Sequence, residues 1–265
     1  MKILVAVNTL TEVDSAVYSN HCQFWFRLGR SSTHDFILYH PRRTSIDRMR
    51  NTAAKVAIEN ECDYLLFVDD DILIPVNVID KLIEADGDCV AGWTIIRGYP
   101  FKNMFYRYSA ELNLVNVKDD ELPDGSFTES GGEVISVDAI GFSCCLLKIE
   151  TLKKVETPYF VTGPYNTEDI YFCVKATRQV ENFSIKVHLG VKTSHNLGAE
   201  YVDPLNKKAF KTYVETMNPG LLDMVDAKLD PLTPIKEDEL KYEQILDQAI
   251  FPECSELEPV EDAPK

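Results

Sequence analysis

The sequence contains no apolar run of the roughly 20 residues needed to cross a membrane. Its first segment, Met1 to Thr9, lacks the long apolar region and small-residue cleavage site of a signal peptide. The seven cysteines include no CxxC pair, and most stand inside apolar runs, where thiols usually pack in the core. We therefore expect a soluble cytoplasmic protein with reduced cysteines, without a closed cysteine–zinc site.

A basic stretch is also missing from a strongly acidic chain. The formal net charge is −16, and residues 226–265 supply twelve acids and four lysines, a net −8, so the other 225 residues also carry −8. Neutralising a phosphate backbone takes clustered Lys and Arg, so an extended nucleic-acid-binding face is disfavoured. With 265 residues, 45% of them hydrophobic, we expect one catalytic domain over 1–220 and an acidic, partly helical extension over 221–265.

Strand and helix patterns alternate along most of the chain. The first predicted strands are 3–7, 35–39 and 64–68, and the helices between them are 15–28 and 45–60. Such a β-α-β-α-β order predicts a mainly parallel α/β sheet flanked by helices, with ligands outside the carboxyl ends of the strands. Further strands are predicted at 88–93, 134–137, 144–148 and 191–195, and further helices at 76–83, 167–176 and 205–217.

Three consecutive aspartates, Asp69, Asp70 and Asp71, follow the apolar segment Tyr64–Val68. Aspartate is a poor strand former and neighbouring carboxylates repel each other, so a cation among them would explain the cluster. Two simpler explanations stay open. The acids could form a solvated strand end, or they could precede the helix near Val76 and interact with the positive end of its dipole.

Two later elements carry residues of similar chemistry. Glu168 and Asp169 open a predicted helix that Thr167 can cap, and acids in a first turn often serve helix electrostatics alone. His195 ends a predicted strand before a glycine turn, and a neutral imidazole with a carboxylate and phosphate oxygens suits Mn²⁺ or Mg²⁺. His188 could also bind a metal, although its alternating surroundings favour a packed histidine.

Together these segments resemble the GT-A-type glycosyltransferases of the broad family 2, including the small stand-alone enzymes of large DNA viruses and phages. The similarity spans roughly residues 1 to 200 in consistent order. Its parts are Arg50-Asn51 with Ala53, the FVDDDI motif, Arg97-Gly98-Tyr99-Pro100, Gly141-Phe142, Thr167-Glu168-Asp169 and His195. The chain has no QxxRW-like segment, which processive members contain, so the resemblance implies transfer of a single sugar.

The resemblance implies roles for the matched residues. Asp71 would coordinate Mn²⁺ or Mg²⁺ with His195, Asp69 would meet the metal shell or the donor ribose, and Asp70 would face the donor sugar. Asp169 would be the general base, with Glu168 in reserve. The other expected site residues are Asn8, Thr9, Arg48, Arg50 and Lys192 for the nucleotide sugar, and Trp93, Arg97, Gly141 and Phe142 for the donor or acceptor sugar.

Two of these residues have simpler explanations. Arg50 could pair with Asp47, three residues earlier, on an exposed helix face. Trp93 stands among aromatic residues that could stack on sugars, but such clusters belong to a protein core more often than to a binding surface. Exposure of each side chain decides between these alternatives.

The implied reaction moves one sugar from a nucleotide-diphosphate sugar, a UDP-sugar in preference to a GDP-sugar, to an acceptor hydroxyl. Inversion at the anomeric carbon is expected, although retaining enzymes share the metal motif. The acidic balance favours a glycan or glycoprotein acceptor over the alternative, a hydroxymethylated pyrimidine in viral DNA. Neither membrane attachment nor an oligomeric state is indicated.

Three other classes are weaker candidates. A sugar-phosphate nucleotidylyltransferase needs a glycine-rich basic loop after its first strand, and this chain has Asn8-Thr9-Leu10-Thr11-Glu12 there. A phosphatase with an aspartate nucleophile would carry its DxD motif on the first strand of the core. A nucleotide-sugar-binding protein that has lost turnover is the non-enzyme alternative, and retention of Asp71, Asp169 and His195 argues against it.

Overall fold

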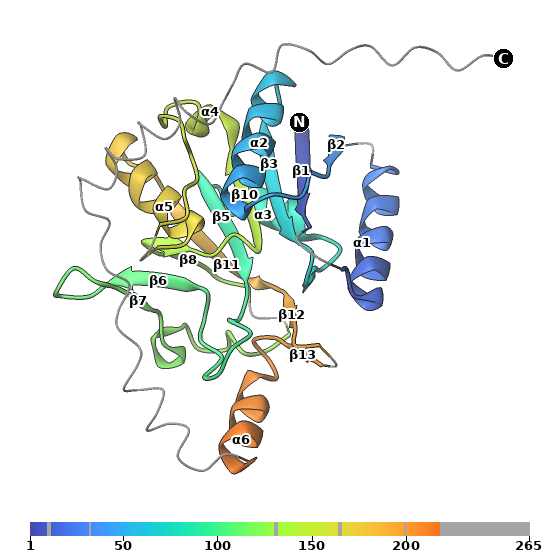
Figure 1. Ribbon diagram of the computed structural model, residues 1–265. Coiled ribbons are helices and arrows are strands. Elements are labelled where there is room, and N and C mark those ends of the chain that lie inside the picture. Colours follow the sequence, from blue (N-terminus) through green and yellow to red (C-terminus); the bar gives the residue numbers. More distant parts are fainter. Residues whose placement is uncertain (10–11, 32, 130–131, 164–165, 199, 218–265) are drawn as a thin grey trace.

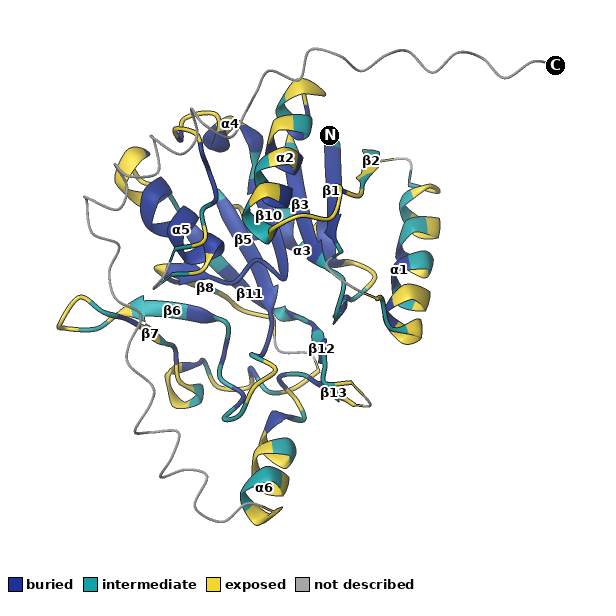
Figure 2. Cartoon of the chain, viewed as in Figure 1, coloured by how far each residue is buried: buried dark blue, intermediate teal, exposed yellow. Residues whose placement is uncertain are grey.

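The computed structural model describes residues 1–9, 12–31, 33–129, 132–163, 166–198 and 200–217. Its centre is a seven-stranded sheet with helices on both faces (Figure 1). In spatial order the strands are β2 (Asp35–Tyr39), β1 (Lys2–Asn8), β3 (Tyr64–Asp69), β10 (Cys144–Lys148), β5 (Cys89–Trp93), β11 (Ile185–Lys192) and β8 (Val134–Ser136). The central strands β1, β3, β10 and β5 are mostly buried (Figure 2). Only β10 and β8 run against the other five, so the predicted mainly parallel sheet is confirmed.

The helices are α1 (Ser15–Leu28), α2 (Ile46–Glu59), α3 (Val78–Glu84), α4 (Ile149–Leu152), α5 (Glu168–Gln179) and α6 (Lys207–Met217), with a 3₁₀ turn at Asp119–Glu121. Successive side chains of a strand point to opposite faces. Leu65 and Phe67 of β3 therefore join the core beneath α2 and α5, whereas Leu66 and Val68 join the core beneath α1 and α3. Asp69 continues the first set, so the strand directs its carboxylate toward α2 and α5.

Two small sheets lie beyond the carboxyl ends of the main strands (Figure 1). One consists of β4 (Ile72–Leu73), β12 (Ser194–Asn196) and β13 (Tyr201–Val202), and the other of β6 (Phe105–Tyr108), β7 (Leu114–Asn116) and β9 (Ala139–Ile140). In the first small sheet His195 is the antiparallel partner of Ile72. This pairing brings the predicted histidine beside the aspartate cluster, although more than 120 residues separate them in sequence.

The last described helix begins two residues later than the sequence pattern predicts. The carboxylate of Asp203 accepts the backbone N–H groups of Leu205 and Asn206 at 2.8 and 2.9 Å, and this turn delays the helix to Lys207. Among the described helices, none has the length and apolarity that crossing a membrane requires. The predicted acidic extension over 221–265 lies outside the described residues.

Candidate functional site

A buried arginine joins the two acidic elements. Arg50 lies on the sheet-facing stripe of α2, four residues before Ala54, and it is only 2% exposed. Its Nε donates to Glu168 Oε1 at 2.9 Å, its Nη1 to the Phe142 carbonyl at 3.1 Å, and its Nη2 to Asp69 Oδ1 at 3.2 Å. One guanidinium therefore connects α2 with the end of β3, the start of α5 and the segment before β10.

This position decides between the two explanations of Arg50. Arg50 does not pair with Asp47. The Asp47 carboxylate instead accepts the backbone N–H of Arg48 at 2.9 Å. Arg48, two residues away on the same helix, is exposed. The predicted contact of Arg50 with a donor diphosphate stays a prediction, because the guanidinium binds acceptors of the protein itself.

Asp69 is a crowded carboxylate. Burial raises its pKa to about 6; the Arg50 guanidinium opposes that rise, and the carboxylates of Asp71, Glu168 and Asp70 add to it. A solvated strand end would leave an aspartate near its ordinary value of 3.8. That simpler explanation therefore fails for Asp69, whose side chain is only 24% exposed.

Asn8 ends β1 beside Asp69, its partner across the parallel ladder. The residue is 1% exposed, and neither its side-chain oxygen nor its nitrogen finds a hydrogen-bond partner among the described residues. A buried polar group without a partner costs about 1–3 kcal/mol. A polar ligand bound at the end of β1 would supply the missing hydrogen bonds and remove this cost. Such binding is what the predicted nucleotide-binding role of Asn8 and of the half-buried Thr9 describes.

Asp71 and His195 form the second half of the site. His195 Nδ1 lies 2.9 Å from the Ile95 carbonyl oxygen, and its Nε2 lies 3.1 Å from Asp71 Oδ2. A carbonyl only accepts, so Nδ1 carries a proton, and Nε2 and the carboxylate then need a second proton or a cation between them. Arg97 Nη1 donates to the same Asp71 oxygen at 2.9 Å. Burial pushes the pKa of Asp71 upward, but His195 and Arg97 lower it below its ordinary value.

The geometry of this pair suits two ligands of one divalent cation. Two ligands at right angles, each about 2.1 Å from an octahedral cation, stand about 3 Å apart, which matches the 3.1 Å between Asp71 and His195. Within the described ranges, no three His, Cys, Asp or Glu side chains converge on one metal position. Asp69 is held by Arg50, so its predicted place in the metal shell stays a prediction.

Asp169 and Glu168 are both buried at the start of α5. Asp169 Oδ1 accepts the Ile170 N–H at 2.8 Å and the Thr167 hydroxyl, while Oδ2 accepts the Phe142 N–H at 3.3 Å. Thr167 has the backbone conformation of a cap, but its hydroxyl binds Asp169 rather than a helix N–H. Burial and the neighbouring Asp169 raise the pKa of Glu168 against the opposing guanidinium.

Gly141 packs against the Met104 side chain, near the start of α5. A Cβ at this position would lie 2.5 Å from Met104 Cε and 3.5 Å from Asp169 Oδ2. The Gly141 N–H also donates to the Met104 carbonyl at 2.8 Å. A side chain at this position would displace the flexible end of Met104 and would only touch Asp169, and the predicted contact of Gly141 with a sugar stays a prediction.

Two aromatic residues expected at a sugar are core residues instead. Trp93 is fully buried, and its indole N–H donates to Asn103 Oδ1 at 2.8 Å. Phe142 is also fully buried, with its ring packed among Phe67, Phe160 and Phe172. Neither ring offers surface to a sugar, and Phe142 contributes to the site only through its backbone N–H and carbonyl.

Two other cationic or titratable candidates have partners of their own. Lys192 is half-buried, and its Nζ donates to the Leu189 carbonyl at 3.0 Å. His188 is buried in β11 and accepts the Gly190 N–H through Nδ1 at 3.1 Å, as expected for a packed histidine. Of the two histidines, His195 is therefore the one that faces the aspartates.

Sequence reasoning missed the contributions of the backbone. The Ile95 carbonyl orients His195, and the Phe142 N–H and carbonyl contact Asp169 and Arg50. Every residue except proline has both groups, so no side-chain pattern could have singled them out. A visible but unused signal was the spacing of Lys207, Lys208 and Lys211, which places three cations within one turn of a helix.

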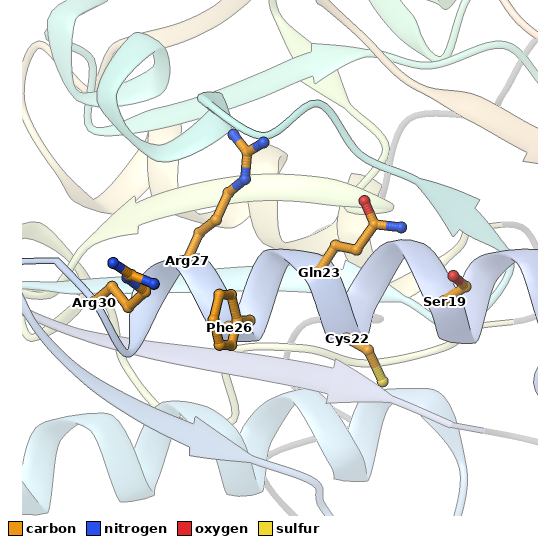
Figure 3. A pocket seen from close by; sticks show the side chains of 6 residues that line it. All are labelled: Ser19, Cys22, Gln23, Phe26, Arg27 and Arg30. Carbon is orange, nitrogen blue, oxygen red and sulfur yellow. The ribbon is translucent and has the colours of Figure 1, made fainter.

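A hollow on the outer face of α1 is separate from this site. Its volume is about 630 Å³. Figure 3 shows its lining side chains, which come from α1 and the turn after it: Ser19, Cys22, Gln23, Phe26, Arg27 and Arg30. None of the residues around Asp69 or Asp71 lines it, so this surface plays no part in the chemistry considered below.

Solved structures with a related fold exist, whereas a scan of family models and a search of curated proteins find no match. A197 from STIV superimposes with a TM-score of 0.51 at 17% identity, over 77% of this chain and 91% of that chain. A 4-diphosphocytidyl-2C-methyl-D-erythritol synthase from Anaerococcus prevotii DSM 20548 gives 0.41 at 10% identity, over 81% and 99%. A glycosyltransferase involved in glycosylation of the major capsid of PBCV-1 gives 0.35 at 10%, over 80% and 100%. Of these three structures, A197 overlaps closely enough to carry an argument, which concerns the fold alone: the two chains share a fold.

Proposed function

We propose that this protein is a metal-dependent glycosyltransferase that moves one sugar from a nucleotide-diphosphate sugar to an acceptor hydroxyl. The observation that carries the proposal is the contact between His195 Nε2 and Asp71 Oδ2 at 3.1 Å, with Nδ1 committed to the Ile95 carbonyl. Metal-binding histidines commonly donate their other N–H to a carbonyl, which fixes the tautomer and aims the free lone pair at the cation.

Asp71 and His195 would hold Mn²⁺ or Mg²⁺, and oxygens of the donor diphosphate would complete its shell. The cation, when bound, neutralises the charge that develops on the departing nucleoside diphosphate. Arg97 is 64% exposed and contacts Asp71, so its guanidinium adds positive charge at the same place. Asp70 would face the donor sugar, and Arg48 and Lys192 remain candidates for the phosphates.

The ends of β1 and β3 would bind the nucleoside. The Asn8 amide, which has no hydrogen-bond partner in the described part of the chain, offers both a donor and an acceptor, and Asp69 beside it can accept from a ribose hydroxyl. Arg50 acts here as a positioning residue, because it holds Asp69 and Glu168 without surface of its own. A UDP-sugar is the preferred donor, with a GDP-sugar as the alternative.

Asp169 would take the proton of the acceptor hydroxyl. The acceptor oxygen forms its bond to the anomeric carbon as the bond from that carbon to the diphosphate oxygen breaks, which inverts the configuration. Thr167 and Ile170 both bind Oδ1, whereas Oδ2 has one contact at 3.3 Å and is the oxygen better placed to receive the proton. A glycan or glycoprotein is the proposed acceptor, and a modified pyrimidine of DNA is the alternative.

The decisive experiment screens nucleotide sugars for release of nucleoside diphosphate with Mn²⁺, Mg²⁺ or EDTA. We expect metal-dependent release by the wild type and loss of metal-dependent donor binding in Asp71→Asn, measured by titration calorimetry. Asp35→Asn is the matched control, because Asp35 is exposed at the opposite end of the sheet. Unaltered Mn²⁺ affinity in Asp71→Asn would remove Asp71 from the ligands. Tight donor binding without release under any condition would favour a binding protein.

A further inference from the structure

A second cavity lies next to the candidate site. It has a volume of about 730 Å³ and is lined by the segment 96–103, the β6–β7 hairpin and its following turn, and α6. Figure 1 shows these elements together beyond the carboxyl ends of the main strands. Pockets for small ligands usually measure about 300–1,000 Å³, so the cavity is large enough for a sugar with a charged substituent.

The lining of this cavity is basic in an acidic protein. The whole chain has 27 Lys and Arg in 265 residues, so fifteen average residues would include one or two. The fifteen lining residues instead include five lysines and a single acid, Asp119. The lysines are Lys102, Lys118, Lys207, Lys208 and Lys211.

Two of these five lysines have counterions among the described residues: Lys207 pairs with Asp119, and Lys211 Nζ lies 3.9 Å from Glu215 Oε1. The one acid, Asp119, pairs with the buried Lys207, which also donates to Asn103 Oδ1 at 2.8 Å. Burial lowers the pKa of Lys207, and the charges of Lys208 and Lys211 add to this effect against Asp119. Among the described residues, Lys102 and Lys118 make no ion pair. Like charges crowded around one cavity are destabilising unless an anion binds there.

Two contacts connect this cavity with the site around Asp71 and Asp169. Ile96, which lines the cavity, directly follows the residue whose carbonyl holds His195, and Arg97 binds Asp71. Tyr106 also lines the cavity. Burial raises the pKa of Tyr106, and the charge of Asp169 raises it further, so the tyrosine lies within the field of the proposed base.

We propose that this cavity binds a phosphate carried by the acceptor, so that the protein glycosylates a phosphorylated small molecule. The inference rests on the proposed function, because it requires the acceptor hydroxyl to reach Asp169 while its phosphate contacts the lysines. Lys102 and Lys118 supply charge without breaking an ion pair of the fold. Lys207 is held in place by Asp119 and Asn103 and forms part of the cavity lining.

The first test measures binding of inorganic phosphate by calorimetry in EDTA, without donor, so that neither metal nor nucleotide sugar contributes. The double variant Lys102→Gln/Lys118→Gln should bind phosphate on the order of tenfold more weakly than the wild type. The control Lys55→Gln/Lys154→Gln changes the charge equally on exposed lysines and should bind as the wild type does. Equal affinity in all three proteins would overturn the proposal.

The second test compares acceptors, with the donor identified by the hydrolysis screen. Sugar phosphates should be glycosylated with a kcat/KM on the order of tenfold above that of the same sugars without phosphate, and the Lys102→Gln/Lys118→Gln variant should lose this preference. Equal transfer to both kinds of sugar would overturn the proposal. So would lysine-dependent binding of an oligothymidylate that inorganic phosphate fails to displace, which would favour a nucleic-acid acceptor.

The two proposals fail separately. Absence of donor hydrolysis by the wild type would remove the proposed function, and with it the acceptor role of the cavity, while lysine-dependent phosphate binding would still be measurable. Donor hydrolysis without lysine-dependent phosphate binding would leave the function intact and remove only this inference. Thermal unfolding of each variant, followed by circular dichroism, confirms that the compared proteins are folded.

Discussion

A partly buried carboxylate has a lowered pKa at one end of the central sheet and a raised pKa at the other. At the amino end of β5, Asp88 accepts the Thr151 hydroxyl at 2.7 Å and the Ser184 N–H and hydroxyl at 2.9 and 2.8 Å. At the carboxyl end of β3, Asp69 is bound by one guanidinium and surrounded by other carboxylates. Burial raises the pKa at both places, but the hydrogen bonds bring that of Asp88 below 3.8, whereas Asp69 stays near 6.

This difference separates an acid that serves the fold from one suited to a ligand. Asp88 joins β5 to α4 and to the turn before β11, and its oxygens are satisfied inside the protein. Asp69 stands beside the Asn8 amide, which has no hydrogen-bond partner among the described residues, and burial with the neighbouring carboxylates keeps the pKa of Asp69 raised despite Arg50. Perturbed carboxylates of the second kind concentrate at functional sites.

The largest expected effect concerns the guanidinium that keeps the site acids in place. Arg50→Met would leave Asp69 and Glu168 buried without their counterion, so the free energy of unfolding should fall by about 3–5 kcal/mol in urea denaturation. Arg48→Met on the exposed face of α2 is the control and should change stability by no more than about 0.5 kcal/mol. Equal urea midpoints for the two variants would show that the acids need no buried counterion.

The next effect should appear in activity rather than in folding. Asp169→Asn removes the proton acceptor but keeps a side chain of the same size, so transfer should fall on the order of 10² or more, about 2.7 kcal/mol in activation free energy. Donor affinity, measured by calorimetry with Mn²⁺, should be retained. Wild-type turnover would eliminate Asp169 as the base, and a joint loss of donor binding would assign it a structural role.

A smaller effect is expected at the opposite end of the sheet. Asp88→Asn should lower the free energy of unfolding by about 1–3 kcal/mol at pH 7, because at least one donor then faces an amide nitrogen. The folded pKa lies below the unfolded value of 3.8, so the contribution of Asp88 is present above about pH 4 and is lost as pH falls through the folded value. Urea denaturation at several pH values should show the difference from wild type shrinking below pH 4, while donor hydrolysis stays unchanged.

The smallest effect, with the opposite pH dependence, is expected for Asp69→Asn. Its raised pKa means that the folded protein binds this proton more tightly, so the wild type loses stability as pH rises from about 4 to 6. The variant should be as stable as the wild type within about 1 kcal/mol at pH 7, since Arg50 keeps Glu168 as a counterion. A loss as large as that of Asp88→Asn would show that Asp69 also serves the fold.

Much of the fold follows from local patterns that the structure preserves. The apolar run Tyr64–Val68 forms a buried strand, and the apolar stripe of α2 is the side of that helix that faces the sheet. Burial of apolar side chains on one face requires a period of 2 residues in a strand and of 3.6 residues in a helix. The same periodicity placed Asn8 and Asp69 on one face. Three predicted site residues, Asp71, Asp169 and His195, lie where strand and helix ends bring them to one edge of the sheet.

The partners of these residues were decided by tertiary structure. Arg50 and Glu168 are 118 residues apart, and the same helical pattern would have allowed Arg50 to pair with Asp47 in solvent. Trp93 was ambiguous because an aromatic ring suits a core as well as a sugar, and only packing settled its burial. Five lysines from two distant parts of the sequence, Lys102 and Lys118 in one and Lys207, Lys208 and Lys211 in the other, likewise line one cavity only after the β6–β7 hairpin and α6 fold against each other.

The sequence by itself determined most strands of the main sheet, the helices α1, α2, α3, α5 and α6, their order, and which strand ends carry acids, since those properties depend on periods of a few residues. The short strands β4, β6, β7, β9 and β13, the short helix α4 and most of β11 were not predicted. Only the tertiary structure decided which acid meets which cation, because ion pairs and orphaned polar groups depend on distances between segments far apart in the chain. The electrostatic contrast between Asp69 and Asp88 belongs to that second level: burial acts on both, and the donors that the fold brings to each carboxylate set the direction of its pKa shift.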